Sequence, residues 1–200
     1  MPFKPKSDLV DVSSFSKLKY KDIFDLGEFY DALHEYLQEM EWKDEDDQSD
    51  HWETYYGERV AQGGAKEIWW RWRMLKKAQG TKLTYFLDMT THLLGVTSAE
   101  IVRDGQKIKT NKAEIEMSFR TSIQQDYLNE FRHHLILKHF GDWFAKKIYF
   151  RVLEQRKKEL YQEAFELQSF MKQWFKMKRY LPYEETKNFF PSYAWPSHQK

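Results

Sequence analysis

The sequence predicts a single α+β domain in which an antiparallel sheet packs under helices. Three observations lead to this fold class. A helical pattern near residue 30 is followed by about 70 residues of period-two alternation, and helical periodicity returns after residue 125. A run of strands flanked by helices is typical of layered α+β domains. We expect residues 1–200 to form one domain, with an ordered core from about residue 20 to 181.

The first predicted element is an N-terminal amphipathic helix from Leu26 to about Trp42. Asp25 and Glu28 have the spacing of a capping box, which satisfies free N–H groups at the start of a helix. Apolar residues recur along this segment at intervals of three and four: Leu26, Phe29, Tyr30, Leu33, Leu37 and Met40. This spacing places them on one face, which should lie against the sheet.

A meander of five or six strands should follow the helix. The expected strands alternate in hydropathy and are separated by turn residues: His51–Val60, Ala65–Lys77, Lys82–Leu94, Ala99–Val102, Lys107–Thr110 and Lys112–Ile123. Gly63-Gly64 and Asp104-Gly105 supply two of the turns, because glycine accepts positive φ. Successive hairpins predict an antiparallel sheet with one buried face.

Two C-terminal helices are expected to pack on the sheet. The first begins at Asp126 and should end near Gly141, since glycine is a poor helix former. The second should run from Asp142 to about Tyr180, because Pro182 cannot continue a helix. The tail, residues 182–200, is rich in proline and aromatic residues and should be extended rather than helical.

Composition favours a cytoplasmic protein. The chain has no cysteine, which excludes disulfides, thiolate zinc sites and cysteine nucleophiles. No stretch reaches the ~20 apolar residues that cross a bilayer, and the first twenty residues lack the apolar core of a signal peptide. Only 41% of residues are hydrophobic, but 18% are aromatic, and side chains of this size can fill a core.

The sequence carries no motif that identifies a reaction. It contains no G-x-G-x-x-G, Walker, G-x-S-x-G or H-E-x-x-H pattern. Glu130 and His133 form one Glu-x-x-His pair, whereas di-iron bundles need two such pairs and further glutamates. The acidic loop Asp44–Asp50 lacks the glycine and the final glutamate of an EF-hand. We therefore expect no catalytic residue, no cofactor and no metal site, although the sequence leaves enzymatic activity open.

Charge is unevenly distributed along a chain whose formal net charge is +1. Residues 21–60 contain fourteen acidic and three basic side chains, whereas residues 141–180 contain five acidic and ten basic ones. This distribution favours solvated faces that attract each other within the fold, or a basic face that binds an anionic partner.

The strand predicted at Ala65–Lys77 is the first candidate binding surface. Trp69, Arg71 and Arg73 share one face of this strand, and aromatic residues beside arginines are typical of single-stranded nucleic-acid platforms. The structural alternative places Trp70 and Trp72 in the core and packs Trp69 against a helix or an arginine.

The C-terminal segment is the second candidate. Basic residues interleave with aromatic ones near the end of the last helix: Lys172, Lys176, Lys178 and Arg179. This pattern suits an acidic protein or an anionic membrane surface, and it also suits a helix end whose dipole attracts cations. Phe189, Phe190 and Trp195 extend the surface into the tail, where clustered aromatic residues favour association.

The chain resembles small proteins of unknown function encoded in archaeal genomes. The resemblance rests on the acidic first helix, the basic aromatic segment Ile68–Arg73, the hairpin Glu100–Glu114 and the polar Gln125–Tyr127 entry to the final helices. It spans roughly Phe24 to Trp174 and implies no particular activity, cofactor or catalytic residue.

We expect a non-enzymatic binding or scaffolding protein that engages a macromolecular partner through its helices and aromatic tail. The expected partner is another protein or a second copy of the chain, and peripheral membrane contact is a further option. Two other functions remain open. One is a nucleic-acid-binding module that uses the Trp/Arg strand, and the other is an enzyme or small-ligand carrier with a pocket between sheet and long helix.

Overall fold

Six strands and one helix make up the first part of the described chain, and helices alone make up the last part. The computed structural model describes residues 8–44, 52–103, 106–134 and 139–177. In chain order the elements are β1 (Leu9–Phe24), α1 (Leu26–Glu39), β2 (Lys43–Asp44), β3 (Glu53–Val60), β4 (Lys66–Lys77), β5 (Leu83–Arg103), β6 (Gln106–Gln125), α2 (Asp126–His133), α3 (Gly141–Lys147) and α4 (Phe150–Trp174). The predicted α+β class with an antiparallel sheet is confirmed.

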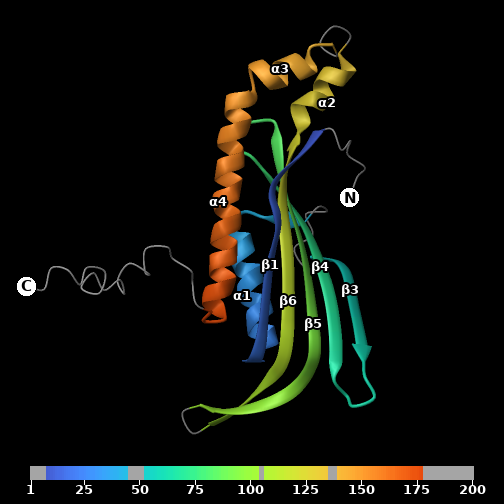
Figure 1. Ribbon diagram of the computed structural model, residues 1–200, viewed down its shortest axis with the longest axis vertical. Coiled ribbons are helices and arrows are strands. Elements are labelled where there is room, and N and C mark those ends of the chain that lie inside the picture. The colour runs from blue at the N-terminus through green and yellow to red at the C-terminus, as the bar shows by residue number, and fades with distance from the viewer. Residues whose placement is uncertain (1–7, 45–51, 104–105, 135–138, 178–200) are drawn as a thin grey trace, which may run out of the picture.

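All paired strands of the sheet are antiparallel. Their order is β1-β6-β5-β4-β2, and β3 also pairs with β4 (Figure 1). β3 pairs with residues 66–72 of β4, and β2 pairs with Met74 and Leu75, so both lie on the edge of β4 opposite β5. β1 forms the other edge, because β6 is its only partner among the described strands.

The predicted N-terminal helix exists as α1, but it is not the first element of the fold. The strand β1 precedes it and begins before the expected start of the ordered core. In β1, Leu18 and Tyr20 alternate with three lysines, and this period-two pattern is hidden by the high lysine content. Two register shifts between Asp11 and Ser16 break the alternation further.

Both ends of α1 follow from local chemistry. The Asp25 carboxylate accepts a hydrogen bond from the Glu28 backbone N–H at 3.0 Å, as a helix cap should. At the other end Glu41 adopts a left-handed φ of 62°, and the Trp42 N–H donates to the Leu37 carbonyl. The helix therefore stops before Trp42 and returns that side chain to the core.

The last two strands, β5 and β6, are longer than predicted. They include the residues for which the sequence predicted a separate short hairpin. Ala99–Val102 and Lys107–Thr110 continue β5 and β6 rather than forming strands of their own. The junction is a register shift between Leu94 and Thr97, where Gly95 has a φ of 62°. At the bottom of Figure 1 the end of this long hairpin curls toward the side of the sheet on which the helices lie, below their ends.

The core lies between one face of the sheet and the helices α1 and α4, which run along the same side of the strands in Figure 1. The helices contribute a buried stripe each: Phe29, Leu33 and Leu37 from α1, and Leu153, Leu160, Ala164, Leu167 and Met171 from α4. The alternation predicted for β4 is confirmed, since Trp70, Trp72 and Met74 are buried. Aromatic rings join the two helices, with Tyr36 stacked on Phe170 at 4.2 Å.

The C-terminal region contains three described helices instead of the expected two. The predicted helix from Asp142 to Tyr180 is divided, with α3 ending at Lys147 and α4 beginning at Phe150. Tyr149 lies at the break, and its ring packs on Tyr127 at 4.5 Å. α4 then ends at Trp174, well before Pro182, because Phe175 is buried and Lys176 adopts a left-handed φ of 53°. No helix in the described residues is long and apolar enough to cross a membrane.

Candidate functional site

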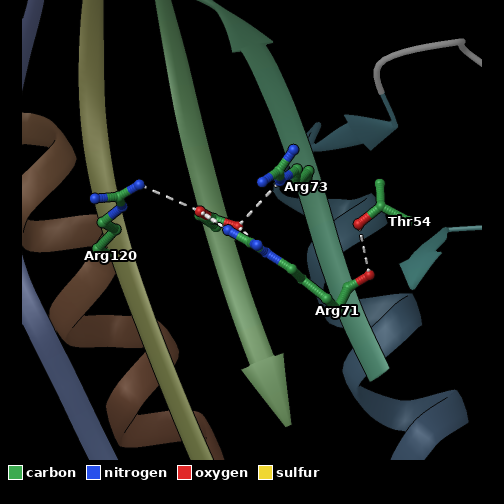
Figure 2. Close-up of polar contacts among 5 residues, drawn as sticks. Thr54, Arg71, Arg73 and Arg120 are labelled. Carbon is green, nitrogen blue, oxygen red and sulfur yellow. Dashed lines mark hydrogen bonds and ion pairs between the residues drawn. The ribbon is translucent and has the colours of Figure 1, made fainter. Parts of the chain in front are cut away.

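The face of the sheet opposite α1 and α4, called here the outer face, carries a connected set of polar side chains. Strand alternation that buries Trp72 and Met89 turns their neighbours Arg71, Arg73 and Asp88 outward. The register places Arg73 opposite Asp88 and Asp88 opposite Arg120. Figure 2 shows Arg71, Arg73 and Arg120 reaching from β4 and β6 toward a common point over β5.

Asp88 is the centre of this set. Arg71 holds it with two hydrogen bonds, from Nε at 2.9 Å and from an Nη at 2.6 Å. Arg73 and Arg120 approach the same carboxylate at 3.6 and 3.4 Å. Burial alone would raise the pKa of the Asp88 carboxyl, but the hydrogen bonds and positive charges of the arginines hold that pKa below its ordinary value. Asp88 is therefore ionised at neutral pH and orders the arginines around it.

An aromatic row crosses the outer face next to the arginines. The Trp69 and His92 rings are stacked at 5.0 Å with an interplanar angle of 11°. A hydrogen bond of 3.0 Å between His92 Nε2 and Glu67 fixes the imidazole. On the other side of Trp69 the register places Gly57, and a Cβ there would meet the Tyr55 hydroxyl at 2.9 Å. The glycine thus lets the exposed Tyr55 ring extend the row.

Charge on the outer face is positive in balance. The counted area runs across the strands from the Arg59–Glu67 pair at one end to the Arg73–Asp88 pair at the other. Its outward-facing side chains include seven cations and four carboxylates: Lys17, Lys19, Lys21, Arg59, Arg71, Arg73 and Arg120 against Glu67, Asp88, Glu114 and Glu116. Several of these groups pair with one another, for example Lys19 with Glu116 at 2.6 Å. An excess of three positive charges remains on this face, although the whole chain carries only +1.

A second surface lies where α2 and α3 extend beyond the ends of the strands, at the top of Figure 1. Four large apolar side chains there are more than half exposed, and we call them the helical tip: Phe140, Trp143, Ile148 and Phe150. Beneath the tip is an open hollow of about 610 Å³ that includes Tyr127, Phe131 and Phe144. Lys82 and Glu130 close part of its rim with an ion pair at 2.6 Å.

A third surface is a groove between α4 and the edge strand β1, with a volume of about 310 Å³. Tyr161 and Phe165 from α4 face Val12 and Ser16 from β1, and both aromatic side chains are more than half exposed. Gln168 crosses the groove and donates a hydrogen bond to the Ser16 hydroxyl at 2.6 Å.

The structure brings together some of the residues that the sequence singled out. Trp69, Arg71 and Arg73 lie side by side on the outer face, half-buried, as their spacing predicted. Lys172 lies on α4 and Lys176 just after it, on the helical side of the sheet and away from that group. Lys178, Arg179, Phe189, Phe190 and Trp195 lie outside the described residues.

The sequence did not identify the partners of these residues. Alternation along β5 gives no contact for Asp88 or His92, whereas in the structure Asp88 binds Arg71 and His92 binds Glu67. The contact of Arg120 with Asp88 depends on strand register, which cannot be read from alternation. In the described part of the chain, no group of three or more His, Asp or Glu side chains is arranged to hold a metal ion.

Comparison with known proteins gives no family for the chain. No protein-family model matches the sequence, and no curated protein matches it. The resemblance to archaeal proteins remains a prediction, and the proposals below rest on the geometry of the three surfaces.

Proposed function

We propose that the protein is a non-enzymatic binding or scaffolding protein that engages an acidic protein partner through the helical tip. The observation that carries this proposal is the exposure of Trp143 on α3 and Phe150 at the start of α4, at 55% and 53%, together with Phe140 and Ile148 at the two ends of α3. Apolar side chains that cluster on a surface mark interaction sites more often than single exposed ones do.

The energetics of association support this role for the tip. Removing a large apolar side chain from water contributes about 1.5–3 kcal/mol, and tryptophan is among the residues that dominate binding energy at interfaces. Elsewhere in the fold most aromatic rings are already packed, as Phe29 and Trp72 are. The tip therefore offers apolar area that the fold itself does not use.

The chemistry around the tip favours an acidic partner. Two exposed cations, Lys147 and Arg151, adjoin the exposed Ile148 and Phe150 in the sequence. Positive charges at the rim of an apolar patch accelerate encounter with a negatively charged surface and help to set orientation.

A small-ligand carrier is supported less well by the packing between sheet and helices. The space enclosed by Leu37, Leu87 and Leu167 measures about 10 Å³, which is about the smallest volume that holds one water. The two larger hollows lie at the surface, and the polar groups at their edges are bonded to each other, as Gln168 is to Ser16.

The test is affinity capture from the native cell with the full chain and a Trp143→Ser/Phe150→Ser variant. We expect a protein that co-purifies with the wild type and is lost with the variant. With that protein purified, the variant should raise Kd at least about tenfold, since two interface aromatics contribute more than the 1.4 kcal/mol of a tenfold change.

Tyr56→Ser is the matched control, because Tyr56 is also more than half exposed but lies on β3. It should retain the partner. Both variants should keep the wild-type melting temperature, since the substituted side chains are largely in water. If the tip variant and the control capture the same proteins with the same affinity, the proposed interface is wrong. Binding to anionic vesicles without any protein partner would contradict the proposal in favour of a membrane surface.

A further inference from the structure

We propose that the outer face binds single-stranded nucleic acid, with bases stacked on the row of Tyr55, Trp69 and His92 and phosphates held by Arg71 and Arg73. This site is separate from the helical tip and does not depend on the function proposed above. Trp69, Arg71, Arg73 and His92 lie on the inner strands β4 and β5, whose opposite faces pack in the core, and Tyr55 lies on the adjoining strand β3.

The aromatic row has the geometry of a base-stacking platform. Trp69 and His92 are already parallel, and Glu67 fixes the imidazole, so little ordering is needed when a base arrives. Tyr55 is 58% exposed, and its hydroxyl lies over Gly57. Gly57 is the residue that pairs with Trp69 in the register. Stacking on such side chains tolerates any sequence, because every base has a π-face.

The arginines are placed to receive phosphates. A guanidinium has five N–H donors, and Arg71 uses only two of its donors on Asp88. Arg73 Nε lies 3.6 Å from the same carboxylate, beyond hydrogen-bond distance. Asp88 is a positioning residue in this arrangement: from β5 it holds the two guanidinium groups of β4 without neutralising both of them.

Charge and shape together favour nucleic acid over an anionic membrane. The seven cations and four carboxylates of the outer face complement a polyanion. A membrane surface would use the same charges, but it needs apolar side chains that project into the bilayer. Trp69 instead is half-buried and stacked on His92, so it does not project as a membrane anchor does.

The experiment measures binding of fluorescently labelled 12-nucleotide dT and U oligomers to the full chain by anisotropy, at salt concentrations from 50 to 300 mM. We expect binding that weakens as salt rises. Trp69→Thr should lower affinity at least about fivefold at each salt concentration and leave the salt dependence unchanged. Arg73→Gln should reduce the slope of log K against log salt by about 0.7, the value for one phosphate contact on a single strand.

Lys158→Gln is the control for charge, because Lys158 is an exposed cation on α4. It should leave both the affinity and the slope unchanged. Where Trp69→Thr does not fold, His92→Thr removes the other half of the stack and should show the same loss. Three results would overturn the proposal: no binding at 50 mM salt, equal effects of Lys158→Gln and Arg73→Gln, or unchanged affinity in the stack variants. Binding to anionic vesicles that Trp69→Thr does not weaken would assign the face to a membrane instead.

Discussion

Asp88 organises the outer face of the sheet. Strand alternation predicts which side chains point outward there, but not that Asp88 binds them together. Its carboxylate is mostly buried and receives two hydrogen bonds from Arg71, with Arg73 and Arg120 nearby. An ionised group in such surroundings is stable only while its partners remain, because burial without them is costly. The residue therefore couples three strands of the sheet through side chains as well as through backbone hydrogen bonds.

Asp88→Asn should lower the free energy of unfolding by about 1–3 kcal/mol at pH 7, the range for hydrogen bonds to charged groups. The amide keeps the shape but removes the charge that the guanidinium groups surround. Urea denaturation monitored by tryptophan fluorescence measures the change. Glu116→Gln is the control, since Glu116 pairs with an exposed lysine, and it should change stability by less than about 1 kcal/mol. Equal effects of the two substitutions would contradict a special role for Asp88.

The pH dependence of the same variant has a definite sign. The pKa of Asp88 is lower in the folded protein than its ordinary value of 3.8, so the carboxylate stabilises the fold above that pH. This stabilisation is lost as pH falls through the folded-state pKa. The difference between wild type and Asp88→Asn should therefore be full at pH 7 and shrink below about pH 4. A difference that stays constant from pH 7 to pH 3 would show that the charge is not its source.

At the scale of elements, the bend in the long hairpin of β5 and β6 depends on Gly95. Gly95 has a positive φ at the register shift, and a Cβ there would meet no atom within 4 Å. Gly95→Ala should therefore cost about 1–2 kcal/mol through backbone strain alone, since left-handed conformations are unfavourable for residues with a Cβ. Thermal or urea unfolding measures this loss.

Gly63 provides a matched control for that substitution. It is also a turn glycine with open space around its Cβ position, but its φ is not positive. Gly63→Ala should change stability by no more than about 0.5 kcal/mol. If both alanine variants lose the same stability, the positive φ at Gly95 is not the cause of the loss.

The elements also show which parts of the fold the sequence could predict. The cap at Asp25, the stripe of α1 and the two faces of β4 depend on near neighbours, and the structure confirms them. The break at Tyr149 depends on packing against Tyr127, more than twenty residues away, and periodicity carries no sign of it. Trp69, Arg71 and Arg73 could be grouped by period two, whereas Asp88 and His92 needed the register between strands.

At the scale of the whole molecule, the fold separates surfaces of different character. The helices cover one face of the sheet and carry the helical tip, while the outer face keeps a row of aromatic and basic groups. The groove beside β1 lies at the edge between these two faces. A partner on the tip and a nucleic acid on the outer face would therefore not compete for space.

The edge strand β1 and its groove offer a docking place for the aromatic tail, residues 182–200, which lies outside the described part of the chain. An edge strand leaves one row of N–H and C=O groups without a strand partner, and an extended segment can pair with it. Phe175 packs on Tyr20 and Phe24 of β1, at 4.5 and 5.3 Å, so the described chain ends near the Phe24 end of that strand. From there twelve residues lead from Met177 to Phe189, an extended reach of roughly 40 Å. Ser13, in the groove, lies eleven residues or roughly 36 Å back along β1.

We therefore expect the tail to dock on its own domain, with Phe189 and Phe190 beside Tyr161 and Phe165. A chain truncated after Tyr183 should melt at a temperature roughly 5–10 °C lower, because burial of two phenylalanines contributes about 3–6 kcal/mol before the cost of ordering the segment. It should also bind more of a dye that detects apolar surface. A Phe189→Ser/Phe190→Ser variant of the full chain should reproduce both effects. Unchanged melting with loss of a co-purifying protein would assign the tail to a partner, and no change in either would show that the groove has no occupant from this chain.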